Sequence, residues 1–408
     1  MQRSGDAATP MQQGSEIRFL VGDGEVLERM GEVRPLPIFA PEAVGLLQAL
    51  SRRLMGEHGA KQFPDLATFA FWCRPSSLRQ MAAGYGDAGI RLGRGVVFHI
   101  APSNVAMNFA YSFAAALLAG NASVVRLPSR AFPQVDLFCG VLQELLRDEM
   151  PEMRPYVCMV RYGHDKDIND RLSLLCDTRI LWGGDRTIGL VRQSPLKPRG
   201  TEVTFADRFS VLLIRPEAYL RAPDKKRIAR DFYNDTYLTD QNACTSPRIL
   251  FWWGKQAGEA QQVFWEELRD VLQEKGYALS GVQAVDKLDR LCCLAAEREA
   301  GWIPSGDNRL FRVRVRKLDG SLRKHIGNSG FFLEYASEDL KDLAAICDER
   351  CQTLSCYGVG KEELEAFVRE NRPRGIDRIV PLGRTMDFSL TWDGVDLVRA
   401  LSRNIVIE

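Results

Sequence analysis

A lone cysteine stands in the polar stretch "TDQNACTSP", residues 239–247. The surrounding pattern predicts that a helix ends near Leu238 and that a strand starts near Arg248, so Cys244 falls in a loop. A loop thiol among small polar residues is accessible and lies near backbone N–H groups, which favour the thiolate. Cys244 is therefore a candidate nucleophile. On these residues alone, a surface cysteine without a role is an equally good interpretation.

A second candidate is Asn104, in "APSNVAMNF", where a predicted strand turns into a predicted helix. Its side-chain amide could donate a hydrogen bond to an oxyanion that develops during acyl transfer. Ser103 or Asn104 could instead cap the helix. The two roles are compatible if the neighbouring residue provides the cap.

Two further turns could bind an anion. The stretch "LWGGD" places Gly183, Gly184 and Asp185 between a strand and a helix, where a ligand can approach the backbone closely. The stretch "RLPSR", residues 126–130, puts two arginines around a serine after another strand, and this arrangement could hold a phosphate. An ordinary solvated loop would also explain the second stretch.

Other reactive residue types are better explained by structure. His99 lies inside the apolar run "VVFHIA", which favours a buried, hydrogen-bonded histidine over a general base. Cys347 and Cys351 fall on a predicted helix at 338–351, but Cys356 follows in an apolar strand and no nearby histidine completes a zinc set. We therefore expect buried cysteines there and no metal.

The elements that must position these residues alternate regularly from residue 95 onward. Apolar runs of strand length are followed by amphipathic helices, which is typical of parallel sheets covered on both faces. The predicted strands are 95–101, 123–127, 156–162, 178–184, 209–214, 247–253, 330–336 and 352–359. The predicted helices between them are 104–121, 133–150, 166–177, 185–194, 224–238, 261–276 and 338–351.

Composition narrows the function classes. The chain has 408 residues, 45% hydrophobic and 26% charged, with a net charge of +1. That length suits two domains, and the charge balance argues against partners such as nucleic acid or an anionic membrane. The polar start and the lack of a long apolar run predict neither a signal peptide nor an integral membrane segment. We expect a cytoplasmic protein with free thiols.

Taken in order, several stretches resemble the aldehyde dehydrogenase superfamily, and within it the long-chain fatty-acyl-CoA reductases of the bacterial bioluminescence (Lux) type. The resemblance covers most of the chain from residue 95 onward. It is carried by the runs "FHIAPSNVAMNFAYSFAAALLAGNASVVRLPSR", "LWGGDRTIGLVRQSPLKPRGTEVTFADRFSVLLI", "DQNACTSP", "HIGNSGFFLEYA", "CQTLSCYG" and "GIDRIVPLGRTMDFSLTWDGVDLVRALSR".

The resemblance implies an aldehyde dehydrogenase-like α/β fold, with two doubly wound domains and the active site in the cleft between them. It suggests a dinucleotide-binding region at 1–214, a cysteine domain at 215–375 and a returning segment at 376–408. Cys244 would be the nucleophile, and Asn104 with the Cys244 N–H would form the oxyanion hole. The implied cofactor-binding residues are Ser103, Arg126, Ser129, Arg130, Gly183, Gly184 and Asp185.

Two departures from the superfamily pattern refine this implication. Arg130 replaces the glutamate that accepts hydrogen bonds from the adenosine ribose in aldehyde oxidisers, and a guanidinium can pair with a 2′-phosphate instead, which favours NADPH. The run "TFADRFS" lacks the acid that activates water in those enzymes, and Glu202 is out of register. A reductase of thioesters needs no such water. Glu334, in "GFFLEYA", is expected at a strand surface.

We therefore expect NADPH-dependent reduction of a fatty acyl thioester, presented on CoA or on a protein, to the aldehyde. The resemblance also suggests a homo-oligomer and an acyl-protein synthetase or transferase partner. Another acylating aldehyde dehydrogenase, or an acyl-phosphate reductase of the same superfamily, is one alternative. A cysteine acyltransferase or thioesterase without redox activity, and a non-catalytic acyl-binding subunit, are alternatives from other classes.

Overall fold

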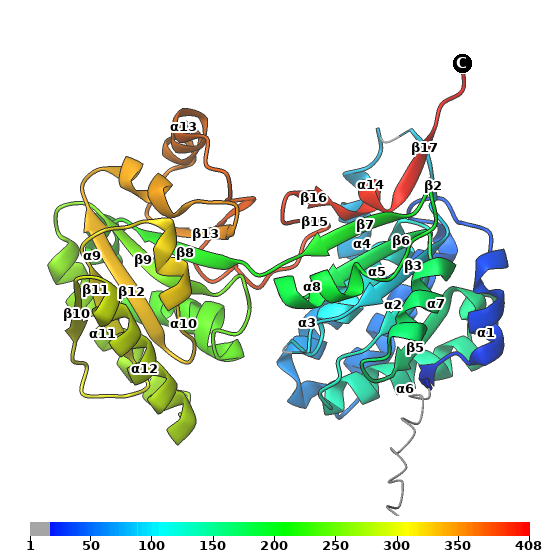
Figure 1. Ribbon diagram of the computed structural model, residues 1–408, viewed down its shortest axis with the longest axis horizontal. Helices are drawn as coiled ribbons and strands as arrows, with labels where there is room; N and C mark the ends of the chain where they lie inside the picture. The colour runs from blue at the N-terminus through cyan, green and yellow to red at the C-terminus, as the bar shows by residue number, and fades with distance from the viewer. Residues whose placement is uncertain (1–16, 88, 104) are drawn as a thin grey trace, which may run out of the picture. The chain divides into compact units, whose positions relative to one another are not determined.

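The computed structural model describes residues 17–87, 89–103 and 105–408, and the chain divides into two compact units. The first unit contains the described residues up to Ala206 together with Leu397–Glu408, and the second is Asp207–Asp396 (Figure 1). The sequence had suggested boundaries at 214 and 375. The structure differs because the strand Phe209–Ile214 pairs within the second sheet, and only the segment from Leu397 onward returns to the first unit.

The first unit is built on a six-stranded sheet in the order β1-β5-β4-β3-β6-β7, which is parallel except for β1 at one edge. A separate pair joins β2 to β17. The strands are β1 (Arg18–Val21), β2 (Ile90–Gly93), β3 (Val96–Ile100), β4 (Ala122–Arg126), β5 (Val157–Arg161), β6 (Thr178–Trp182), β7 (Thr201–Phe205) and β17 (Ser402–Ile405).

Every residue of β3, β4 and β6 is buried, as expected for central parallel strands that carry helices on both faces. The helices of this unit are α1 (Gly24–Arg29), α2 (Pro41–Gly56), α3 (Pro64–Trp72), α4 (Pro75–Ala83), α5 (Asn108–Leu118), α6 (Pro133–Asp148), α7 (Lys166–Leu175), α8 (Asp185–Val191) and α14 (Leu397–Ala400), with 3₁₀ turns η1 (Met30–Glu32), η2 (Ala60–Gln62) and η3 (Pro151–Tyr156).

The buried Asn121, just after α5, forms hydrogen bonds with the backbone of neighbouring segments. The Asn121 side-chain oxygen accepts from the backbone N–H groups of Arg94 and Gly95 at 2.7 and 3.1 Å, and its nitrogen donates to the Leu401 carbonyl at 2.9 Å. Gly120 before it has φ +86, and a Cβ there would lie 2.0 Å from the Leu36 carbonyl oxygen. This residue pair therefore ends the helix where the sequence predicted a stop.

The second unit contains a seven-stranded sheet in the order β10-β11-β12-β9-β8-β13-β14, parallel except for β10. A two-stranded hairpin of β15 and β16 follows it. The strands are β8 (Phe209–Ile214), β9 (Pro247–Trp253), β10 (Ala300–Ile303), β11 (Phe311–Val315), β12 (Phe331–Ser337), β13 (Cys351–Tyr357), β14 (Arg378–Pro381), β15 (Thr391–Trp392) and β16 (Val395–Asp396).

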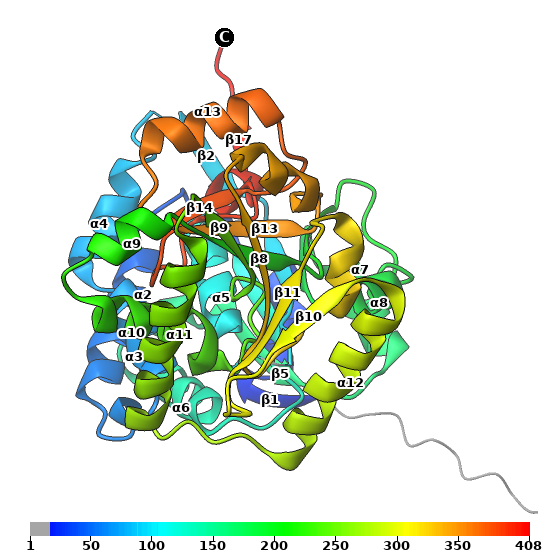
Figure 2. The same cartoon turned by 90° about the vertical axis from the view of Figure 1, so that its left-hand side faces the viewer.

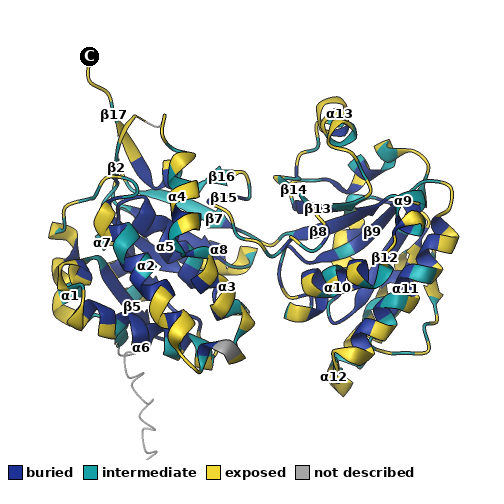
Figure 3. Cartoon of the chain, turned by 180° about the vertical axis from the view of Figure 1, so that it is seen from behind, coloured by how far each residue is buried: buried dark blue, intermediate teal, exposed yellow. Residues whose placement is uncertain are grey.

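Helices cover both faces of this sheet, and Figure 2 shows α10 and α11 on one side and α12 on the other. The interior strands of each sheet are deeply buried, as Figure 3 shows, whereas edge strands such as β10 and β14 are partly exposed. The helices of the second unit are α9 (Pro216–Arg221), α10 (Lys225–Thr236), α11 (Ala257–Glu274), α12 (Gly281–Glu297) and α13 (Lys361–Asn371), with 3₁₀ turns η4 (Tyr237–Thr239), η5 (Gly320–His325) and η6 (Leu340–Ile346).

One predicted helix is not formed as expected. The helix predicted at 338–351 is only the 3₁₀ turn η6, and Cys351 already belongs to β13. The chain turns there because β13 must enter the sheet between β8 and β14. The backbone of Gly375 packs closely against this turn, since a Cβ on Gly375 would lie 2.0 Å from the Asp348 carbonyl oxygen. The strand β7 and the helix α12 were not predicted.

Candidate active site

The loop that carries Cys244 has an unusual backbone. Asp240 and Gln241, which follow η4, have φ angles of +58 and +55, a conformation that costs free energy for residues other than glycine. The Gln241 N–H donates to the Thr236 carbonyl at 2.8 Å, which fixes the turn to the end of α10. Such a conformation persists only where its neighbours hold it, and the polar contacts around the loop do so.

Gln241 is fully buried and joins the loop to the start of β12. Its side-chain oxygen accepts from the N–H groups of Gly330 and Phe331 at 2.7 and 3.2 Å, and its nitrogen donates to the Pro247 carbonyl at 3.1 Å. The side chain thus substitutes for backbone pairing between two segments far apart in sequence. Replacing it would leave several buried polar groups without partners.

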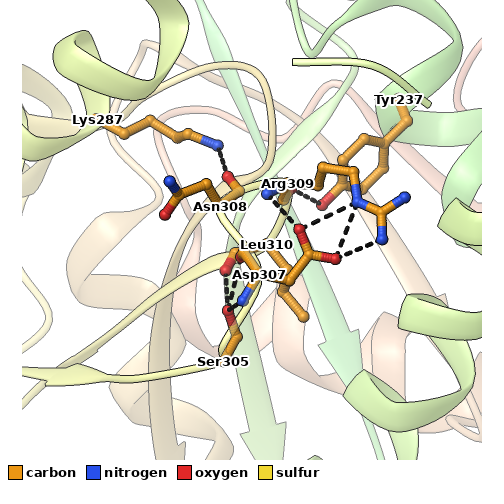
Figure 4. Close-up of polar contacts among 7 residues, drawn as sticks. All are labelled: Tyr237, Lys287, Ser305, Asp307, Asn308, Arg309 and Leu310. Atoms are coloured by element: carbon orange, nitrogen blue, oxygen red, sulfur yellow. Dashed lines mark hydrogen bonds and ion pairs between the residues drawn. The ribbon is translucent and has the colours of Figure 1, made fainter. Parts of the chain in front are cut away.

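A neighbouring segment, 305–310, is anchored in the same region by two side chains, as Figure 4 shows. The hydroxyl of Tyr237, in η4, donates to the Arg309 carbonyl at 3.0 Å. The ammonium of Lys287, in α12, bonds the carbonyl oxygens of Asn308 and Ser329, and burial lowers its pKa to about 8. α12 is therefore tied to the elements that flank the cysteine loop.

The Cys244 thiol is half-buried, and burial raises its pKa to about 11. The nearby carboxylate of Asp393 raises this pKa further, while the side-chain amide of Gln352 and the charge of Arg248 oppose the rise. The expectation that the loop favours the thiolate therefore differs from the structure: desolvation outweighs the donors, and the resting sulfur is protonated at neutral pH.

The starts of two strands and one hairpin turn surround Cys244. Its carbonyl accepts from the hydroxyl of Ser210, in β8, at 2.7 Å, and Gln352 lies at the start of β13. The Gln352 amide donates to Asp393, which occupies the turn between β15 and β16, and Asp393 lies 3.7 Å from the guanidinium of Arg208. Gln352 and Asp393 were not singled out from the sequence.

The candidate cofactor residues lie along one edge of the first sheet. β3, β4 and β6 are adjacent and parallel, so the residues after their carboxyl ends meet at that edge. Ser103 follows β3, residues 127–130 follow β4 and residues 183–185 follow β6. Ser103, Ser129, Arg130 and Asp185 are all exposed.

The two arginines of "RLPSR" have different environments. Arg126 is buried, donates to the Gly163 carbonyl at 3.0 Å and packs 4.6 Å from the centre of the Tyr162 ring. Its guanidinium is therefore engaged by the residues that follow β5. Arg130 is exposed, packs 5.2 Å from the centre of the Phe132 ring and forms no ion pair with any described residue. Only Arg130 is left with its charge available to a ligand.

The glycine turn after β6 leaves room beside the backbone. Gly184 is the N-cap of α8, and a Cβ added to Gly183 would meet only the Thr187 side chain, at 3.5 Å or more. A Cβ on Gly189 would meet nothing within 4 Å. Packing among the described residues does not require Gly183 or Gly189, so this open turn and the available Arg130 fit the phosphates of a dinucleotide.

Asn104 lies outside the described residues, and so the predicted oxyanion contact with the Cys244 N–H stays a prediction. Among the described residues there is no group of three or more His, Cys, Asp or Glu side chains placed to hold a metal ion. Cys347 and Cys351 are buried, and Cys356 is half-buried.

Two buried polar residues, His99 and Glu334, differ in how well their environments were predicted from the sequence. His99 is fully buried between the hydroxyls of Ser112 and Ser123, at 2.8 and 3.3 Å, and burial lowers its pKa to about 3. This environment agrees with the structural role expected for it. The expectation that Glu334 lies at a strand surface is wrong, because Glu334 is fully buried in the central strand β12.

Glu334 can be buried because its partners neutralise the charge of its carboxylate and donate hydrogen bonds to both of its oxygens. One oxygen accepts from Arg312 at 2.7 Å, and the other accepts from the indole nitrogens of Trp252 and Trp265 at 3.1 and 2.9 Å. A charge with this many donors can be accommodated in a core. Glu202 is also engaged, since Arg179 and Arg192 donate to it at 2.6 and 2.7 Å.

Comparison with known proteins places the chain in a family. The sequence model of the family described as acyl-CoA reductase (LuxC) matches residues 74–404, which is well over half of the chain. The chain belongs to the acyl-CoA reductase (LuxC) family. The resemblance drawn from the sequence motifs is thereby confirmed, and membership of the LuxC family identifies an oxidoreductase that acts on acyl groups and implies a nicotinamide cofactor. No curated protein matches the chain significantly.

This LuxC family member is similar in fold to several solved aldehyde dehydrogenases. Lactaldehyde dehydrogenase from Escherichia coli has a TM-score of 0.66 at 12% identity, over 97% of this chain and 96% of that one. Aldehyde dehydrogenase 21 from Physcomitrella patens, in complex with succinate, has a TM-score of 0.67 at 10% identity, over 93% and 88%. A mutant of 1-pyrroline-5-carboxylate dehydrogenase from Thermus thermophilus has a TM-score of 0.64 at 12% identity, over 93% and 82%.

These likenesses confirm the predicted aldehyde dehydrogenase-like α/β fold. Within the described part of the chain, no helix combines the length and the apolar character that a bilayer crossing requires.

Proposed function

We propose that this protein is an NADPH-dependent reductase of fatty acyl thioesters that works through an acyl-enzyme on Cys244. The observation that carries the proposal is the match of residues 74–404 to the acyl-CoA reductase family, combined with a half-buried cysteine in a rigid loop. The overall reaction converts an acyl thioester, a reduced nicotinamide and a proton to an aldehyde, a free thiol and the oxidised nicotinamide.

The chain's own residues account for the acyl transfer. The Cys244 sulfur loses its proton, forms a bond to the acyl carbon and displaces the carrier's thiolate, which takes up a proton in turn. Because the two thioesters are similar in energy, this exchange needs positioning more than driving force. The loop contacts of Gln241 and Ser210 provide that positioning. A nicotinamide cofactor, when bound, supplies the hydride for the reductive half.

Two observations support reduction rather than hydrolysis. Glu202, which is near but out of register with the position where aldehyde oxidisers carry their water-activating glutamate, is engaged by two arginines. The exposed, unpaired Arg130 is suited to the 2′-phosphate that distinguishes NADPH from NADH. We further propose a cytoplasmic location, since all ten cysteines are free thiols.

The domain roles and partners are part of the same proposal. The first unit would hold the cofactor and the second the nucleophile. The acyl group would arrive on CoA or on a partner protein such as an acyl-protein synthetase or transferase, and the enzyme would act as a homo-oligomer. Long-chain donors are proposed on the family match alone.

The decisive experiment follows radioactive acyl-CoA and NADPH oxidation in parallel. Without NADPH the wild type should retain acyl label, and adding NADPH should release the label as aldehyde. Cys244→Ser should abolish thioester labelling and NADPH oxidation, whereas Cys292→Ser, at an exposed cysteine, should leave both unchanged. Labelling that persists in Cys244→Ser would overturn the assignment, and label released as free acid without NADPH oxidation would identify a thioesterase instead.

A further inference from the structure

The surroundings of the Cys244 sulfur contain a pair of residues that the proposed reaction has not yet used. Gln352, at the start of β13, is almost fully buried, with 1% of its surface exposed. Asp393 lies in the turn between β15 and β16, in a segment that forms a separate hairpin. β13 pairs with β8 in parallel, with Cys351 opposite Phe209, so Gln352 lies next to the strand position of Ser210, whose hydroxyl donates to the Cys244 carbonyl at 2.7 Å. The charge of Asp393 raises the pKa of the thiol, whereas the side-chain amide of Gln352 lowers it.

The hydrogen bond between the two side chains fixes the orientation of the amide. The Gln352 side-chain nitrogen donates to an Asp393 carboxylate oxygen. An ionised carboxylate only accepts, so the nitrogen of the amide must face it. The other N–H of the same nitrogen is then available to the sulfur, and the Gln352 oxygen has no partner among the described residues.

The turn that holds Asp393 is well suited to present its carboxylate. Asp393 and Gly394 have φ angles of +48 and +74, which is the two-residue hairpin turn favoured by Asp-Gly. Two charged side chains lie on the other side of the carboxylate: Arg208, at 3.7 Å, and Asp377, which pairs with the same arginine. The charge of Arg248, in β9, also acts on the thiol and lowers its pKa.

We propose that Gln352 donates a hydrogen bond to the Cys244 sulfur and stabilises its thiolate, and that Asp393 is a positioning residue that orients the Gln352 amide for this contact. The inference rests on the proposed role of Cys244 as the nucleophile. The thiolate is the species that attacks the thioester and the species released when the aldehyde leaves, so the same hydrogen bond assists the first and last steps of the cycle.

Asp393 has two separable effects. Its negative charge disfavours the thiolate, while its oxygen orients the donor that favours it. Asp393→Asn removes the charge and keeps an acceptor oxygen. Asp393→Gly removes both, and each residue tolerates the positive φ at this position. Gln352→Met keeps the volume of the side chain and removes the donor.

The test is the rate of Cys244 alkylation by iodoacetamide from pH 7 to pH 10, followed on the Cys244 peptide by mass spectrometry in the full-length protein without substrate. In the wild type the rate should rise about tenfold per pH unit without a plateau, because the thiol pKa is about 11. Gln352→Met should slow alkylation about tenfold, since the loss of a hydrogen bond to a charged group lowers the population of the thiolate by about that factor. Asp393→Asn should accelerate it about threefold, as expected for removal of one partly screened charge.

The comparison of two neutral variants isolates the orienting role. Asp393→Asn should react about fivefold faster than Asp393→Gly. The free energy that corresponds to this ratio is a modest part of what one charge-assisted hydrogen bond contributes. In the Gln352→Met background the two should react equally. Asp387→Asn removes an equal charge from an exposed ion pair with Arg384 and should leave the rate unchanged.

Each outcome is decisive. A wild-type rate in Gln352→Met, or slower alkylation in Asp393→Asn, overturns the inference. If the alkylation rates of Asp393→Asn and Asp393→Gly still differ in the Gln352→Met background, Asp393 does not act by orienting Gln352. If Asp393→Gly fails to fold by circular dichroism, Gln352→Met and Asp393→Asn still decide through their opposite shifts. Failure of acyl labelling at Cys244 refutes the proposed function separately, because alkylation requires no acyl transfer.

Discussion

The two candidate regions lie at opposite ends of their strands. The proposed cofactor residues follow the carboxyl ends of β3, β4 and β6, whereas Cys244, Ser210 and Gln352 lie at the amino ends of β9, β8 and β13. Ser103, Ser129, Arg130 and Asp185 in the first region are exposed, whereas buried side chains hold the second region in place. A cofactor that exchanges in every turnover needs an open binding surface, while a nucleophile must return to one position. The contrast predicts that substitutions will affect stability in the second region and ligand preference in the first.

The largest effect is expected at Gln241. Gln241→Leu leaves the N–H groups of Gly330 and Phe331 and the Pro247 carbonyl without their partner, and each such group costs about 1–3 kcal/mol. We expect the free energy of unfolding to fall by about 3 kcal/mol and reductase activity to fall at least ~100-fold, because the thiol loses its position. Urea unfolding and NADPH oxidation measure the two effects.

Gln262→Leu is the matched control, since Gln262 is exposed on α11 and donates to Glu266, one turn along the same helix. It should change neither quantity appreciably. Near-normal activity in Gln241→Leu would show that the loop does not need this anchor.

A smaller, purely functional effect is expected at Arg130. Arg130→Glu should lower the ratio of kcat/KM for NADPH to that for NADH by about 10- to 100-fold, because a carboxylate repels a 2′-phosphate and can accept from ribose hydroxyls. Its melting temperature should stay within about 1 °C of the wild type, since exposed substitutions rarely change stability. Arg52→Glu, on the exposed face of α2, should leave the ratio unchanged. An unaltered ratio in Arg130→Glu would leave the NADPH assignment without support.

A further effect concerns the pH dependence of stability and depends on the buried His99, in β3. The pKa of His99 falls from 6.5 to about 3 on folding, so the neutral ring contributes stability above pH 6.5 that is lost as the pH falls towards 3. Between pH 6.5 and 4.5 this group alone should remove about 2–3 kcal/mol. His99→Gln cannot titrate, so its stability should decline less over that range in urea unfolding. Parallel declines in the two proteins would refute this role.

The sequence predicted elements where local periodicity was strong and missed features that depend on distant partners. The strands around His99 and Phe251 are continuous apolar runs, and these were placed correctly. Glu334 was misplaced because the groups that permit its burial, Arg312, Trp252 and Trp265, come from three other elements. A strand that is covered on both faces does not show the alternation from which an exposed position is inferred.

The candidate site shows the same limit. Cys244 was found because its loop is locally distinctive, with polar residues between a helix and a strand. Gln352 and Asp393 were not found, because an ordinary strand residue and an Asp-Gly turn become notable only when the fold brings them to the sulfur. Residue types point to a candidate nucleophile, but the groups that would set its pKa are determined by tertiary structure.

The pairing of β17 with β2 has a consequence for biosynthesis. β2 leaves the ribosome before any of the second unit, and β17 only after all of it. Until then the Arg91 side chain has no Ser402 to bind and the buried Asn121 amide has no Leu401 carbonyl. The first unit therefore cannot complete its own hydrogen bonding during translation, and an unpaired strand edge stays exposed while the second unit is still being made.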